Sequence, residues 1–60
     1  MTYFLFYDGA RREYFVVEGD DWVVEDAYEE ALNIVDVKDE LEFIGIISAE
    51  EVDARNYVVY

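Results

Sequence analysis

Carboxylates are the only abundant side chains in this sequence that could take part in chemistry. Sixteen Asp and Glu residues stand against four Lys and Arg, and there is no His or Cys. Two carboxylates can act as general acid and base when burial moves their pKa values apart. The adjacent pairs Asp20-Asp21, Glu29-Glu30 and Glu50-Glu51 would diverge by about 100° on a helix, away from a common site. The sequence therefore predicts a protein that is not an enzyme and has no catalytic residue.

The other common kinds of site lack their usual residues. Zinc loses its imidazole and thiolate ligands, and no glycine-rich phosphate-binding motif is present. The ligand spacing of an EF-hand loop is also absent. Ser48 begins the stretch Ser-Ala-Glu-Glu, which is better explained as a helix cap than as the setting of a nucleophile. We therefore expect no metal site and no cofactor.

The formal charge of −12 at pH 7 indicates which partners this chain would bind. Such a field repels nucleic acid and anionic membranes and attracts a positively charged protein surface. A simpler explanation stays open, since negative charge also promotes solubility and is tolerated in high-salt organisms. Residues 1–8 contain no basic signal-peptide region, and nothing approaches a membrane span, so we expect a cytoplasmic protein.

The first third of the chain predicts a β-hairpin. Thr2–Asp8 alternates two sets of apolar side chains, so both faces of this strand are apolar and it should be central in a sheet. Asp8–Arg11 has turn chemistry, and Glu13–Glu18 is again rich in strand-forming residues. We expect these two strands to pair.

Two interpretations compete for Trp22–Val24. In the first, Asp20 or Asp21 caps a long helix that begins at Trp22. In the second, these residues belong to a third strand, and Asp26 caps the helix with Glu29 three residues later. Both interpretations place a helix from about residue 27 to residue 36.

The expected helix is amphipathic. Its acidic residues flank or oppose a stripe that follows the i, i+3, i+4, i+7 spacing of a buried face. Ile34 lies off this stripe, as does Val23 if it is helical, and both are candidates for exposure. The stripe consists of Val24, Ala27, Tyr28, Ala31, Leu32 and Val35.

The remaining residues complete a small single domain. Leu41–Ile47 reads as a strand with two apolar faces, Ser48 as the cap of a short helix over 49–54, and Asn56–Tyr60 as strand-like. We therefore predict one acidic α+β domain over residues 1–60. It has a small antiparallel sheet, with the order β-β-(β)-α-β plus a short helix or strand, and one main helix packed on one face.

One helix cannot cover both apolar faces of such a sheet. An uncovered face of this kind is an aggregation hazard in a monomer. We expect it to be covered by a second copy of the chain, by the target protein, or by the C-terminal segment folded back. The first option defines an alternative function, that of a homodimeric structural or adaptor module.

The acidic arc of the main helix is the candidate binding surface. Duplex DNA carries one charge per roughly 1.7 Å of its axis, so a rigid carboxylate array would compete for a surface that binds it. Aromatic residues outside the core can add dry contacts, whereas Tyr3, Tyr7, Tyr14 and Tyr28 are expected in the core. The array could extend to Asp20, Asp21, Glu50, Glu51 and Asp53. The predicted partner-binding residues are Glu25, Asp26, Glu29, Glu30 and Asp36, with Trp22, Ile34, Tyr57 and Tyr60 as apolar anchors.

In size, acidity and lack of catalytic residues, the chain resembles small inhibitors encoded by phages and other mobile elements. These include DNA-mimic, anti-restriction and anti-CRISPR proteins. The resemblance covers composition over the full length. It implies a protein inhibitor that acts in the cytoplasm of a host cell, where it occupies the basic surface of a nucleic-acid-binding defence nuclease.

A second, local resemblance concerns the start of the main helix. The stretch EDAYEEALN is similar to the GDTxEEAxxN helix start of HicB-type antitoxins, which have a partial ribonuclease-H-like fold. Asp26, Glu29, Glu30, Ala31 and Asn33 match that pattern. This resemblance implies an antitoxin with a toxin partner as the alternative function.

Overall fold

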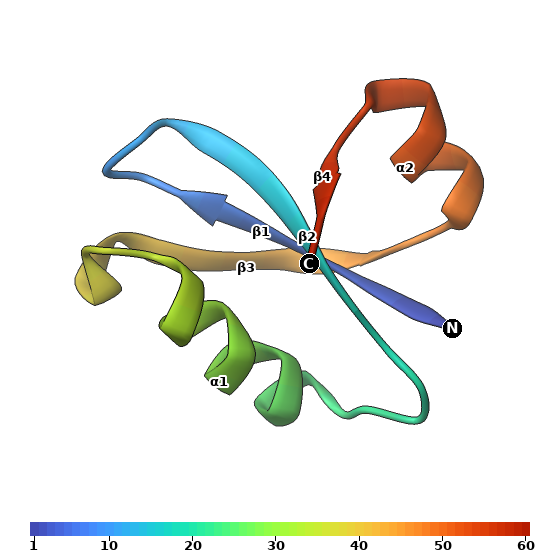
Figure 1. Cartoon of the computed structure of the whole chain (residues 1–60), viewed down its shortest axis with the longest axis horizontal. Coiled ribbons are helices and arrows are strands. Elements are labelled where there is room, and N and C mark those ends of the chain that lie inside the picture. The colour runs from blue at the N-terminus through green and yellow to red at the C-terminus, as the bar shows by residue number, and fades with distance from the viewer.

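One mixed sheet of four strands, in the order β3-β1-β2-β4, organises the protein. The computed structural model describes residues 1–60, and it confirms the α+β class (Figure 1). The helix α1 lies on one side of the sheet and α2 on the other. The elements in chain order are β1 (Thr2–Asp8), β2 (Glu13–Gly19), α1 (Val24–Ile34), the 3-10 turn η1 (Lys38–Glu40), β3 (Leu41–Ile47), α2 (Ala49–Arg55) and β4 (Val58–Val59).

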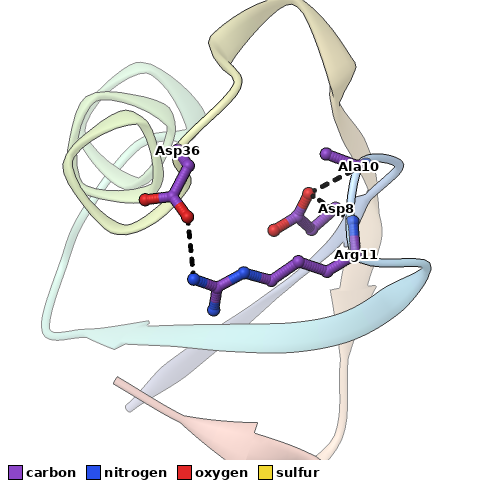
Figure 2. Close-up of polar contacts among 4 residues, drawn as sticks. All are labelled: Asp8, Ala10, Arg11 and Asp36. Carbon is purple, nitrogen blue, oxygen red and sulfur yellow. Dashed lines mark hydrogen bonds and ion pairs between the residues drawn. The ribbon is translucent and has the colours of Figure 1, made fainter.

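The predicted hairpin is confirmed, and β1 is the central strand. β1 and β2 pair antiparallel from Thr2 opposite Gly19 to Asp8 opposite Glu13. The buried carboxylate of Asp8 forms the turn, because its Oδ1 accepts hydrogen bonds from the backbone N–H groups of Ala10 (3.1 Å) and Arg11 (3.3 Å) (Figure 2). Short polar side chains of this kind stabilise turns by satisfying nearby backbone donors. Asp8 is therefore a structural residue.

The alternation of β1 and β2 separates two cores, one on each face of the sheet. On the α1 face, the predicted stripe of the helix packs on phenylalanines of the strands, and Ala27 and Ala31 are fully buried. The small alanines bring the helix close to the sheet, while Val24, Tyr28 and Leu32 pack at its margins. This larger core consists of Phe4, Phe6, Phe15, Val17, Ala27, Ala31, Val35 and Leu41.

The second face is covered by the chain itself. Leu5 and Val16 are buried there against Val52 of α2, and Tyr57 packs at the edge of the same cluster. The third of the three expected covers, the folded-back C-terminal segment, is thus the one that this structure has. Covering by a second copy is not required to bury Leu5 and Val16.

Neither interpretation of Trp22–Val24 is correct in full: Val24 is helical, as in the long-helix interpretation, but Trp22 and Val23 are not. Residues 20–23 form neither a strand nor helix, and α1 begins at Val24 after an extended Val23. No side chain caps this end, so Asp20, Asp21 and Asp26 lack the predicted capping role. Asp21 adopts a left-handed backbone conformation (φ 55°), which a short polar side chain tolerates and which breaks a strand or helix at that point.

The end of α1 comes two residues before the predicted Asp36. Val35 is extended, and its N–H closes the last turn on the carbonyl of Ala31 at 3.2 Å. Lys38 reaches back so that its Nζ donates to the carbonyl of Leu32 at 2.6 Å. A cation at this end satisfies a free carbonyl and opposes the negative pole of the helix dipole.

The last third of the chain follows the prediction with one addition. β3 has the predicted bounds, and Ser48 caps α2, since its Oγ accepts a hydrogen bond from the N–H of Glu51 at 3.2 Å. Asn56 ends α2 in a left-handed conformation. β4 then pairs parallel with β2, opposite Phe15 and Val16, which makes the sheet mixed where an antiparallel sheet was expected.

Candidate protein-binding surface

The exposed face of α1 carries four of the five predicted acidic contact residues. Glu25, Asp26, Glu29 and Glu30 are all exposed, because the helical period that buries Ala27 and its neighbours turns these positions away from the sheet. Glu25 and Asp26 lie in the first turn, where the positive pole of the helix dipole stabilises them. No cationic side chain pairs with any of the four.

Asp36, the fifth predicted residue, is occupied by an internal contact. Its Oδ2 accepts a hydrogen bond from the guanidinium of Arg11 at 2.8 Å, so the hairpin turn is joined to the residues after α1 (Figure 2). The hydrogen bond and the charge of Asp36 raise the pKa of Arg11 above its ordinary value. Asp36 is therefore paired with a cation, unlike the four unpaired carboxylates of α1.

The wider acidic array does not form one surface. Glu50 and Asp53 belong to α2, on the side of the sheet opposite α1 (Figure 1). Glu51 forms an ion pair with Arg55 at 3.7 Å, and Asp20 lies 3.9 Å from the amino group of Met1. The uncompensated carboxylates of α1 and α2 therefore face different directions, and a single flat partner can engage only one group at a time.

The predicted apolar anchors are divided in the same way. Trp22 and Ile34 are partly buried against the α1 core, near the two ends of α1. Tyr57 is partly buried in the cluster on the α2 side. Tyr60 is 54% exposed. Its ring stands edge-on to that of Phe15, a residue of the α1 core, with the ring centres 5.7 Å apart. Of the four residues, Tyr60 is the one whose ring is free to contact a partner.

Trp22 is held by contact with Gly19, and this contact predicts a measurable effect. A Cβ at Gly19 would overlap Cδ2 of the indole and lie 2.6 Å from its Cγ. We expect Gly19→Ala to displace Trp22 and lower the free energy of unfolding by about 1–3 kcal/mol. Because Trp22 is the only tryptophan, its fluorescence should shift to the red. Gly45→Ala is the matched control, as a Cβ there meets no atom within 4 Å; equal effects of the two changes would contradict this account.

A row of three tyrosines is the feature that the sequence prediction missed. Tyr7 and Tyr14 are opposite each other in the hairpin, with ring centres 4.8 Å apart, and Tyr57 lies 6.2 Å beyond Tyr14. Tyr14 is half-exposed, although it was expected in the core. The hairpin register already predicts the first pair. The third ring depends on how α2 folds back, which no local pattern shows.

An open hollow of about 310 Å³ lies beside Tyr7 at the start of β3. Its other lining residues are Gly9, Asp39, Glu40, Leu41 and Glu42. Glu42 pairs with Tyr7 across the two strands. The hollow is therefore an anionic surface with one aromatic wall, suited to a cationic side chain rather than to an anion.

No known family matches this chain, and neither a curated protein nor a solved structure shows significant similarity to it. Neither helix has the length and apolar character needed to cross a membrane. No group of three or more acidic side chains is arranged to hold a metal ion.

Proposed function

We propose that this protein is a non-enzymatic inhibitor that binds the basic, nucleic-acid-binding surface of another protein through the exposed face of α1. A nuclease complex of host defence is the kind of target that fits this chemistry. The observation that carries the proposal is the set of unpaired carboxylates Glu25, Asp26, Glu29 and Glu30 on one helix of a chain with charge −12.

The charge density of this face supports imitation of nucleic acid. From Glu25 to Glu30 the helix rises about 7.5 Å, at about 1.5 Å per residue. Four carboxylates over that length approach the density of duplex DNA, which is one charge per roughly 1.7 Å. The buried alanine side of α1 holds the backbone that carries these carboxylates against the sheet. A basic groove built for a phosphate backbone would therefore meet a similar field on this helix.

Steering by this field should appear in the association rate. The four carboxylates are exposed, so salt screens them, and rim charges of this kind act mainly on the rate of encounter. Tyr60, whose ring lies against Phe15 on the side of the sheet that α1 covers, is the exposed aromatic contact that can add affinity, since such rings are favoured as interface anchors.

Displacement of a fluorescent DNA duplex from a basic defence nuclease tests the proposal. We expect the protein to release the duplex, and we expect the double variant Glu29→Lys/Glu30→Lys to do so about tenfold less well because it reverses charge at the contact. Raising the salt concentration should slow association of the wild-type protein more than that of the variant.

The matched control places the same change of charge on the other side of the sheet. Glu50→Lys/Asp53→Lys alters two exposed carboxylates of α2 and changes the net charge equally. It should retain most of the displacement activity. Equal losses in both double variants would mean that net charge alone is responsible, and a salt-independent interaction would exclude the electrostatic mechanism.

A further inference from the structure

The outer edge of β3 is an unpaired edge of this small sheet. β3 pairs with β1 on one side and has no neighbour on the other. From residue 42 to residue 47, no backbone hydrogen bond to a turn, loop or side chain is made on the outer side. An open edge presents donors and acceptors in the spacing that another extended chain can match.

The strand pairings show which residues present these groups. Tyr60 and β2 exchange hydrogen bonds, from the N–H of Tyr60 to the carbonyl of Val16 and from the N–H of Glu18 to the carbonyl of Tyr60. Backbone groups alternate in direction along a strand. The same alternation, followed from β2 across β1 to β3, directs the backbone N–H and carbonyl of Ile47 toward β1. The backbone N–H and carbonyl of the neighbouring residue, Ile46, therefore point outward.

Exposed apolar side chains accompany this edge. Ile46 is 61% exposed and Ile44 is 46% exposed, although a strand edge is normally protected by charge or proline. β3 has no Lys, Arg or Pro, and its only charged residue is Glu42. A bulge between the partners of Leu5 and Phe6 interrupts the strand, so the regular part of the edge is short and suits a short segment better than a long sheet.

Charge selects the occupant of this edge. A second copy of the chain would bring another net charge of −12 to the same place, together with its own Asp39, Glu40 and Glu42. Like charges opposed across strands are destabilising. An extended segment with alternating basic and apolar residues would instead place cations toward Glu42 and the hollow beside Tyr7, and its apolar residues toward Ile44 and Ile46.

We infer that the outer edge of β3 docks an extended basic segment of the partner by strand addition, with Ile46 supplying the backbone hydrogen bonds. This inference rests on the proposed function for the positive charge of the partner. It adds a second contact, at the opposite edge of the sheet from β4, to the one made by α1.

Titration of the full chain with the capped peptide Lys-Val-Lys-Val-Lys-Val-Lys tests this inference. We expect the amide chemical shifts of residues 43–47 to change and the outward amide of Ile46 to become protected from hydrogen exchange. Ile46→Pro removes that outward N–H without removing a bond to β1 and should weaken binding about tenfold. Ile46→Thr keeps the N–H and a β-branched side chain, so it should retain more affinity than Ile46→Pro.

Changes in the peptide keep the test independent of variant folding. A peptide with N-methyl groups on alternate valines lacks the backbone N–H donors needed to pair with β3. It should not change the amide chemical shifts of residues 43–47. Shifts confined to α1 would overturn the β3 inference and leave the proposed function intact. Equal binding of a peptide in which Glu replaces each Lys would also overturn the β3 inference. Chemical shifts of β3 that depend on protein concentration in the absence of peptide would overturn it as well. If the peptide binds at β3 but the protein does not displace the duplex, the proposed function is contradicted and the β3 inference is not.

Discussion

Replacing Phe6 with Ala should unfold most of the protein under conditions in which the wild-type chain is folded. Phe6 is 0% exposed, and its ring lies 5.6 Å from that of Phe15, 6.0 Å from Tyr28 and 5.5 Å from Phe43. The side chain therefore joins β1 to β2, α1 and β3. Removing a buried Phe costs about 3–5 kcal/mol. A chain of this length has only about 3–9 kcal/mol in total.

Circular dichroism with urea measures this effect. We expect the Phe6→Ala midpoint to fall to low denaturant, with loss of both helix and strand signals in one transition. Val23→Ala is the control, because Val23 is exposed before α1 and makes no core contact. A Phe6→Ala protein with a near wild-type midpoint would show that the rings around Phe6 do not form the common core described above.

Local patterns were sufficient for the hairpin and for the buried side of α1. Alternation in Thr2–Asp8, followed by the Asp-Gly turn, predicts both the strands and their pairing, because each signal concerns neighbouring residues. The stripe containing Ala27 and Ala31 is likewise a matter of helical period, and all six of its residues lie in or against the α1 core. The Ser48 cap was predictable for the same reason.

Residues 20–23 were not predictable from local signals. Their path is set by the contact of Trp22 with Gly19 and by the left-handed backbone of Asp21. Capping and strand propensities therefore gave two local interpretations, and the tertiary contact overrode both. Because these residues form no strand, only two strands precede α1. One of the two interpretations predicts a third strand there.

The exposure of the α1 carboxylates was predictable, but the arrangement of the wider set of residues was not. The helical period shows which carboxylates of α1 are exposed, whereas it cannot show that Glu50 and Asp53 lie across the sheet from them. That separation follows from α2 folding onto Leu5 and Val16, which are distant in sequence. The open edge of β3 depends on strand order, so it too becomes visible only in the fold.

The docking of α2 rests on Val52, and Val52→Asp should release it. Val52 is one of only three buried residues in the second core, with Leu5 and Val16. A carboxylate at this position would be buried without a cation, which costs about 3 kcal/mol or more. Because the second core is small, we expect residues 49–60 to detach from the sheet before the larger α1 core unfolds.

Hydrogen exchange distinguishes this local release from global unfolding. The amides of Val52, Tyr57 and Tyr60 donate to the carbonyls of Ser48, Val52 and Val16, so all three should lose protection in Val52→Asp while paired amides between β1 and β2 keep theirs. Ala54→Asp adds the same charge at an exposed position of α2 and should leave protection unchanged. Equal loss in both variants would mean that charge on α2, and not burial of Val52, controls docking. Release of α2 would also uncover Leu5 and Val16, so Val52→Asp should associate more than Ala54→Asp in sedimentation measurements.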